Sequence, residues 1–166
     1  FMEDKTMMLF PQWKQAVQNF IEEGFKPGDV VTKEWLYENF GLEIPTPDTT
    51  TQKYQQTQLI YLTMIENFKE MLLTDHKILL ISKRGVGYTY VEPEYQASVA
   101  EHQMHIELKK ALDRSATRLQ HTDIQALDDD QRKQHADAMA RTAMLGSMMK
   151  KKRRSLRRNV ELPEDT

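Results

Sequence analysis

The sequence predicts a mainly helical fold with one small β-hairpin, followed by a helical arm. Three observations support this prediction. Apolar residues recur at helical spacing in several segments, and the stretch KILLISKRGVGYTYV at Lys77–Val91 places two short apolar runs around a Gly-Val-Gly turn. The composition also changes after Pro93. We therefore expect a domain over residues 1–93, a helical arm over residues 94–149 and a basic tail over residues 150–166.

The composition excludes several classes of protein. The chain has 166 residues, of which 39% are hydrophobic and 29% are charged, as is typical of a soluble globular protein. No apolar run approaches the roughly 18 residues that span a bilayer, and no secretory signal is visible at the start. The chain contains no cysteine, which excludes disulfides and thiolate chemistry. We expect a cytoplasmic protein without membrane contact.

Charge is distributed unevenly along the chain. The formal net charge is −2, but the part before Lys150 holds 16 basic and 22 acidic residues and therefore carries −6. The segment KKKRRSLRR that follows is strongly basic. Its cations are Lys150, Lys151, Lys152, Arg153, Arg154, Arg157 and Arg158. Such a run complements the dipole of a helix end, and it also suits contact with a polyanion, which we expect here.

Two helices and a very short strand are expected in the first part of the chain. A helix begins at Pro11 and ends at Gly24, because proline suits the first helical position and glycine suits a stop. Its apolar face comprises Trp13, Val17, Phe20 and Ile21. After a strand at Asp29–Val31, Thr32 caps a second helix that ends at Gly41. The inward-facing residues of this helix are Trp35, Leu36 and Phe40.

A third, long helix is expected from about Thr50 to Thr74, after an irregular loop with two prolines. Its first half, TTQKYQQTQ, is polar and rich in glutamine, whereas its second half, LIYLTMIENFKEMLL, is apolar. The apolar stripe comprises Tyr61, Ile65, Phe68 and Leu72. We expect the second half to lie in the core and the first half to project from the body or to pack on a partner.

The resulting order is helix, short strand, helix, helix, strand, strand. This is the order of a winged helix-turn-helix, in which the third helix enters the major groove of DNA and the hairpin forms the wing. Because wing tips lie near the phosphates, Lys83 and Arg84 are expected to contact the DNA backbone or to enter the minor groove. The two glycines beside them permit a tight turn.

The segment RGVGYTYV (Arg84–Val91) resembles the wing of the effector domains of OmpR-type response regulators, where a similar Arg-Gly-x-Gly-Tyr closes the hairpin. The resemblance implies a winged-helix fold over about Pro11–Pro93 and binding to duplex DNA. The chain departs from that family in three ways: no receiver domain precedes the motif, the third helix is longer, and the chain continues well beyond the wing. We therefore do not expect activation by phosphorylation of a receiver domain.

The residues expected to read DNA lie on the polar half of the third helix. They are Gln52, Lys53, Tyr54, Gln55 and Gln56. Glutamine pairs bidentately with adenine, and lysine contacts guanine or a phosphate. Glutamine is also a good exposed helix former without any ligand, but within a winged helix we expect contact with the groove. Lys33, near the start of the second helix, is expected to contact a phosphate.

Two further helices are expected after Pro93, over Glu94–Leu119 and Leu127–Arg154, with the polar break QHTD before the second. This pattern predicts an antiparallel helical hairpin or a dimerisation arm. The second helix carries a methionine-rich surface that comprises Met139, Met144, Leu145, Met148 and Met149. Methionine stripes usually belong to a core, but they also suit adaptable partner surfaces. A homodimer through these helices is therefore one expectation, and a different protein partner is another.

No catalytic, metal or cofactor site is expected. His102 and His105, with Glu101 beside them, could begin a metal site, but no second pair with matching spacing follows. The Gly-Val-Gly turn lacks the lysine and hydroxyl residue of a phosphate-binding loop, and there is no nucleophile elbow. We expect a non-enzymatic protein.

Two functions fit these patterns. The first is a duplex DNA-binding regulator of transcription or replication that uses the winged helix and the basic tail. The second is an interaction protein of a phage or mobile element that binds or inhibits a host protein through the same scaffold. The acidic charge before Lys150 favours the second function, because many DNA-binding domains are basic. RNA binding is less well supported, since no aromatic strand platform is visible.

Overall fold

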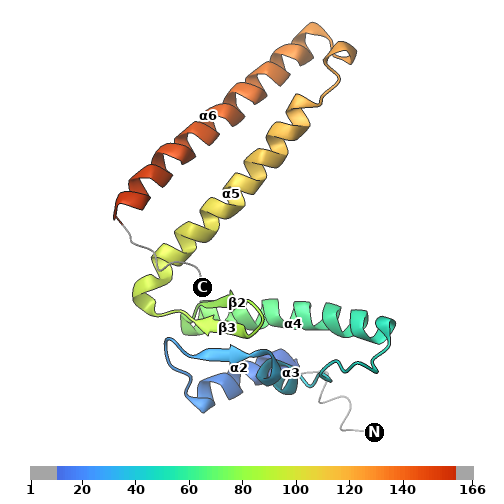
Figure 1. Cartoon of the computed structure of the whole chain (residues 1–166), viewed down its shortest axis with the longest axis vertical. Helices are drawn as coiled ribbons and strands as arrows, with labels where there is room; N and C mark the ends of the chain where they lie inside the picture. The colour runs from blue at the N-terminus through green and yellow to red at the C-terminus, as the bar shows by residue number, and fades with distance from the viewer. Residues whose placement is uncertain (1–10, 160–166) are drawn as a thin grey trace. The chain divides into compact units, whose positions relative to one another are not determined.

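The computed structural model describes the backbone of residues 11–159 and the side chains of residues 11–150. The chain divides into two compact units, Phe1–Gln96 (unit 1) and Ala97–Thr166 (unit 2). Their helices and strands are labelled in Figure 1. In the described part of the chain, no helix combines the length and the apolar character that a membrane span requires.

Unit 1 is mainly helical and contains one small sheet. Its elements are, in order, α2 (Gln12–Glu23), β1 (Val30–Thr32), α3 (Lys33–Asn39), α4 (Thr51–His76), β2 (Leu80–Lys83), β3 (Gly87–Tyr90) and a 3₁₀ turn at Pro93–Tyr95. The strands are antiparallel in the order β1-β3-β2, so β3 pairs with both neighbours. The predicted mainly helical class with a small β element is confirmed, and the helices and strands follow one another in the predicted order.

The ends of these helices have the expected chemistry. Gly24 ends α2 in the left-handed region at a φ of 74°, which glycine adopts without steric cost. The Thr32 hydroxyl accepts a hydrogen bond from the Trp35 N–H at 3.2 Å and so caps α3. The Thr50 hydroxyl accepts one from the Lys53 N–H at 3.3 Å and caps α4 in the same way.

The core of unit 1 is centred on aromatic side chains. Phe20 of α2 and Phe68 of α4 are at most 1% exposed, and their rings meet edge to face with centroids 6.0 Å apart. Such a pair contributes about 0.5–1.5 kcal/mol beyond the burial of its area. Trp35 of α3 packs edge-on against Phe20 with a centroid distance of 6.1 Å. The other buried residues are Ala16, Val17, Val31, Leu36, Tyr37, Phe40, Tyr61, Ile65, Leu72, Ile78, Leu80 and Val91.

One prediction of an inward-facing side chain needs correction. Ile21 is 43% exposed, because α2 buries only the narrower face around Val17 and Phe20. Trp13 and Trp35 are partly buried and pack against the core, as predicted, and the Trp35 Nε1 donates a hydrogen bond to a Glu23 carboxylate oxygen at 2.7 Å.

The second half of α4 is only partly core. The predicted stripe of Tyr61, Ile65, Phe68 and Leu72 is buried, as expected. However, four other apolar residues of this half face away from the core and are exposed. They are Leu59, Ile60, Leu62 and Leu73. The prediction that this half lies in the core is therefore correct for the stripe and wrong for these four residues, because unit 1 covers only one side of the helix.

Unit 2 is a pair of antiparallel helices, α5 (Gln96–Gln120) and α6 (Asp129–Asn159), connected through a 3₁₀ turn at Ile124–Ala126. Figure 1 shows α6 running back alongside α5. A ring nitrogen of His135 on α6 lies 2.7 Å from the Leu119 carbonyl oxygen of α5, which joins the helices near the turn. In the described part of unit 2, no side chain is buried. The two helices alone therefore do not enclose a core.

The start of α6 is capped reciprocally. The Gln131 N–H donates to an Asp128 carboxylate oxygen at 2.8 Å, and the Gln131 side-chain oxygen accepts from the Asp128 N–H at 3.0 Å. The carboxylates of Asp129 and Asp130 in the first turn also complement the helix dipole. This local chemistry places the helix start at Asp129, two residues after the predicted start at Leu127.

Gly87 provides a test of the sheet. A side-chain Cβ at this position would clash with the Val31 carbonyl oxygen of β1, whereas a Cβ at Gly85 would meet no atom within 4 Å. We expect Gly87→Ala to lower the free energy of unfolding by about 3 kcal/mol. In the control, Gly85→Ala, the alanine side chain meets no neighbour, and only the left-handed backbone at a φ of 78° lowers the free energy of unfolding, by about 1–2 kcal/mol. Chemical denaturation of both variants measures the difference, and equal losses would contradict the close approach of β1 and β3.

Candidate nucleic-acid interface

The first turns of α4 expose all the residues predicted to read DNA. These residues are Gln52, Lys53, Tyr54, Gln55 and Gln56. Thr50 caps the helix directly before them, so their backbone is already helical. In Figure 1 this end of α4 extends beyond the strands of the sheet. The polar half of the helix thus projects beyond the sheet, which is one of the two predicted arrangements.

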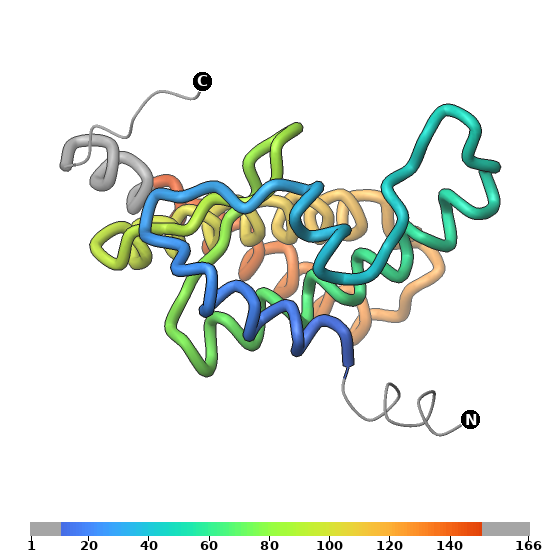
Figure 2. The backbone as a smooth tube through the Cα atoms, turned by 90° about the horizontal axis from the view of Figure 1, so that it is seen from below, coloured from blue at the N-terminus to red at the C-terminus, as the bar shows by residue number. Residues whose placement is uncertain are grey.

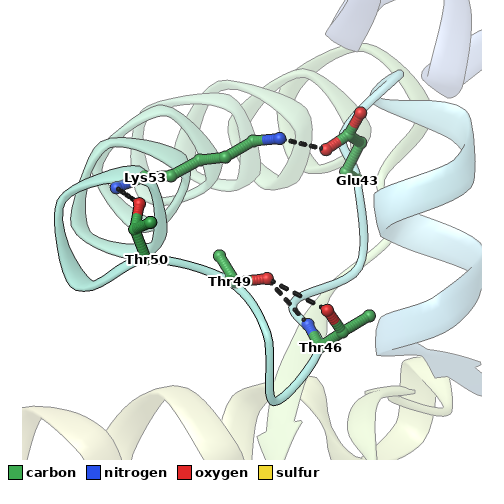
Figure 3. Close-up of polar contacts among 5 residues, drawn as sticks. All are labelled: Glu43, Thr46, Thr49, Thr50 and Lys53. Carbon is green, nitrogen blue, oxygen red and sulfur yellow. Dashed lines mark hydrogen bonds and ion pairs between the residues drawn. The ribbon is translucent and has the colours of Figure 1, made fainter.

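The loop before α4 folds back onto the start of the helix (Figure 3). Lys53 Nζ donates a hydrogen bond to Glu43 Oε2 at 2.6 Å. Within the loop, the Thr49 hydroxyl accepts a hydrogen bond from the Thr46 N–H at 3.0 Å, and the chain then reaches the Thr50 cap. The sequence pattern misses the contact between Lys53 and Glu43, because nine residues, two of them prolines, lie between these residues. A phosphate that approaches Lys53 would therefore meet the Glu43 carboxylate beside the lysine ammonium.

Lys53 holds the pKa of the Glu43 carboxyl below its ordinary value. The hydrogen bond from the lysine ammonium is the main cause, and the positive charge of that ammonium is the second. Glu43 and Lys53 are both largely exposed, and exposed pairs contribute little to stability because water and salt screen them. The contact therefore orients Lys53 rather than stabilising the fold.

The turn between β2 and β3 carries Lys83 and Arg84. Lys83 pairs with Gly87 across the two strands, and the Val86 N–H donates to the Lys83 carbonyl oxygen at 3.0 Å. Gly85 adopts a φ of 78°, which a residue with a side chain rarely adopts. Both cations are exposed, and the turn stands out from unit 1 in Figure 2.

Lys33 is joined to this turn through the main chain. Its N–H donates a hydrogen bond to the Val86 carbonyl oxygen at 3.1 Å. The preceding residue, Thr32, pairs with Gly87 at the same end of the sheet. The fold therefore gathers Lys33, Lys83 and Arg84 around one turn, and we call these three residues the β-turn cluster. The sequence predicts a separate phosphate contact for Lys33 but not its connection to the turn.

The other predicted cations lie outside the β-turn cluster. Lys150 is exposed on α6 of unit 2. The side chains of the remaining basic residues are outside the described part of the structure, although their backbone belongs to α6. These residues are Lys151, Lys152, Arg153, Arg154, Arg157 and Arg158. Helix α6 continues to Asn159, so the basic segment extends a helix instead of following it.

Carboxylates outnumber cations in unit 1. Residues 11–96 contain eight lysine and arginine side chains and twelve aspartate and glutamate side chains. The β-turn cluster is therefore a local positive site on an acidic unit. In residues 11–150, no three histidine or carboxylate side chains gather in a way that could hold a metal ion.

The contact between Lys53 and Glu43 can be tested by titration. We expect Lys53→Gln to raise the pKa of the Glu43 carboxyl toward its ordinary value, because the positive charge is lost and the shorter, neutral amide is a weaker donor than the ammonium. In the parent chain, the ion pair should break only as the pH falls through the lowered pKa. NMR titration of the Glu43 carboxyl carbon measures this change. Lys33→Gln is the control, and an equal shift in that variant would contradict a specific pair.

Comparison of the chain with protein family models, with curated proteins and with solved structures finds no match.

Proposed function

We propose that this chain is a non-enzymatic winged-helix protein that binds duplex DNA and regulates transcription or replication. One observation carries the proposal: Lys33, Lys83 and Arg84 gather around the turn of a β-hairpin that follows a long helix with an exposed polar end. The strand order β1-β3-β2 and the order of the elements support the winged-helix assignment.

In this proposal the two parts of the interface have different roles. The first half of α4 enters the major groove, where Gln52, Gln55 and Gln56 read base edges and prefer adenine. The β-turn cluster is the wing and contacts phosphates, which position the protein without reading the sequence. Lys53 reaches a phosphate or guanine once it exchanges Glu43 for the nucleic acid.

The basic end of α6 adds phosphate contacts. Seven cations lie between Lys150 and Arg158, and the helix continues through this segment. Each lysine or arginine that neutralises a phosphate releases a counterion, so the tail strengthens binding to every sequence and makes it sensitive to salt. This contribution offsets the excess of carboxylates in unit 1.

We also propose that the chain forms a homodimer through the helices of unit 2. No side chain is buried in the described part of this helical pair, and Met144, Leu145 and Met148 of α6 are each more than half exposed. Packing of two such pairs gives a four-helix bundle, which buries this surface. A dimer would also present two winged-helix units to two half-sites.

A second candidate function is binding to a host protein through unit 1. The net negative charge of residues 11–96 is the observation that favours it. The two functions predict different affinities for duplex DNA, because a chain that binds only a folded protein partner needs no affinity for a polyanion. A chain that shows no affinity for duplex DNA at low salt, but retains its fold, would support the second function and overturn the first.

The wing predicts a defined change in DNA binding. We expect Lys83→Ala with Arg84→Ala to weaken binding to all duplexes alike and to reduce the log–log salt slope by about one unit for each lost contact. The matched control, Lys14→Ala with Lys26→Ala, removes two cations outside the β-turn cluster and should change the slope little. Binding isotherms at several salt concentrations measure both. An unchanged slope in the wing variant would exclude the β-turn cluster from the interface.

The glutamines of α4 should behave differently in the same assay. Replacement of Gln52, Gln55 and Gln56 by alanine should flatten the preference among sequences, at about 1–3 kcal/mol for each bidentate contact. Affinity for non-specific DNA should change much less, because these side chains are neutral. If selection from random duplexes returns the same motif for the variant and the parent, α4 is not the recognition helix.

The dimer proposal predicts the effect of charge in the apolar surface of α6. Leu145→Glu with Met148→Glu should convert a dimer into a monomer, because carboxylates cannot be buried unpaired in a helical bundle. Ile124→Glu is the control, since Ile124 is also exposed in unit 2 but lies at the turn between the helices. Light scattering of the full chain measures the mass. If the parent chain is already monomeric, this surface would instead be assigned to contact with a different protein partner.

A further inference from the structure

One flank of α4 carries an exposed apolar surface that neither the core nor the proposed DNA contacts use. Leu59, Leu62 and Leu73 are 67%, 54% and 46% exposed on this flank, which lies beside the buried stripe that contains Phe68. The proposed DNA contacts give a role to the glutamines in the first turns of this flank. They give no role to the three leucines further along the helix. A leucine row of this kind on a long helix is typical of contact with another helix.

The spacing along this side is that of a helix–helix seam. Leu59, Leu62, Glu66, Lys69 and Leu73 follow one another at intervals of three, four, three and four residues. This is the heptad pattern of positions that face a partner helix in a coiled coil. Two positions near the middle of the seam are charged rather than apolar, and their charges are opposite. We call these five residues the α4 seam.

The charges decide which partner fits. If two copies of α4 pair in parallel and in register, Glu66 faces Glu66 and Lys69 faces Lys69, which is repulsive. If the helices pair antiparallel around a twofold axis between Asn67 and Phe68, Glu66 of one copy lies beside Lys69 of the other. The same axis places Leu62 beside Leu73. The seam is therefore complementary to itself in the antiparallel direction at its charged pair and at Leu62 and Leu73, while Leu59 lies opposite His76 at the end of the partner helix.

Lys69 lies where the seam borders the sheet. Its Nζ lies 3.2 Å from a carboxylate oxygen of Glu66 in the same chain and 5.4 Å from the centre of the Tyr88 ring. The Lys69 side chain is 30% exposed, and that of Glu66 is 73% exposed. A carboxylate from a second copy would extend this ion pair into a small network, so that no charge of the seam would be buried without a partner.

We infer that the α4 seam pairs antiparallel with the same seam of a second copy of this chain. This inference rests on the proposed dimer through unit 2. A single helix seam is small compared with the roughly 1,000 Å² that a stable interface buries, so we expect it to form between chains already held together elsewhere. The pairing leaves Gln52–Gln56 beyond the end of the partner helix and so does not compete with the proposed groove contacts.

Engineered cysteines test the register, because the full chain contains no cysteine of its own. In the double variant L62C/L73C, the two positions on one helix are about 16 Å apart, at 1.5 Å per residue, which is too far for an internal disulfide. Antiparallel pairing places position 62 of one copy beside position 73 of the second copy. Mild oxidation should therefore give a covalent dimer on a non-reducing gel, and a reductant should reverse it.

The controls separate the register from chance collisions. L62C alone and L73C alone should not cross-link, because the axis keeps identical positions apart. The variant I21C/I44C, with two cysteines at other exposed positions of unit 1, should cross-link at least about tenfold more slowly than L62C/L73C. In the L62C/L73C background, E66K should slow cross-linking about tenfold, and the exchange E66K/K69E should restore it.

Each outcome decides one point. Cross-linking of L62C alone would mean parallel pairing and would overturn the antiparallel seam. A dimer by light scattering that gives no cross-link in L62C/L73C would overturn the inference while leaving the proposed dimer intact. A parent chain that is monomeric by light scattering, and that gives no cross-link, would overturn both the dimer and the seam.

Discussion

The burial of one side of α4 is the constraint on which the rest of unit 1 depends. Phe68 packs edge to face against Phe20 of α2, and Tyr61, Ile65 and Leu72 lie on the same buried side. Full burial of one such side chain contributes about 1.5–3 kcal/mol, so together they fix the rotation of the helix about its axis. Once this rotation is fixed, the faces that carry the glutamines and the outward leucines are fixed as well.

The position of the β-turn cluster depends on main-chain bonds rather than on its own side chains. Val31 of β1 is fully buried, and β1 pairs with β3, whose Gly87 has no side chain to hold the strands apart. The bond from the Lys33 N–H to the Val86 carbonyl oxygen then ties the start of α3 to the turn. The cations are thus carried by a hydrogen-bonded main chain, and their side chains remain exposed to solvent.

Much of unit 1 could be predicted from the sequence, because its signals are local. Caps at Thr32 and Gly24, the spacing of the α4 stripe and the glycines of the turn each act within a few residues. The rest depends on contacts between distant segments. Apolar residues occur on both sides of α4, so spacing alone cannot tell that Leu59 and Leu62 face outward. Likewise, nothing near Lys53 in the sequence indicates that its ammonium group donates a hydrogen bond to Glu43.

The strand order of the sheet has a consequence for how the protein behaves when concentrated. In the part of the chain that the structure describes, the central position belongs to β3, so both edges are formed by very short strands, β1 with three residues and β2 with four. The unpaired N–H and C=O groups of an exposed edge strand can form hydrogen bonds with a strand of another chain, and a longer edge offers more of them. These edges offer few such groups, and Lys83 ends one of them with a charge. The sheet is thereby protected from growing into β-type aggregates, even in a chain that is rich in exposed leucine and methionine.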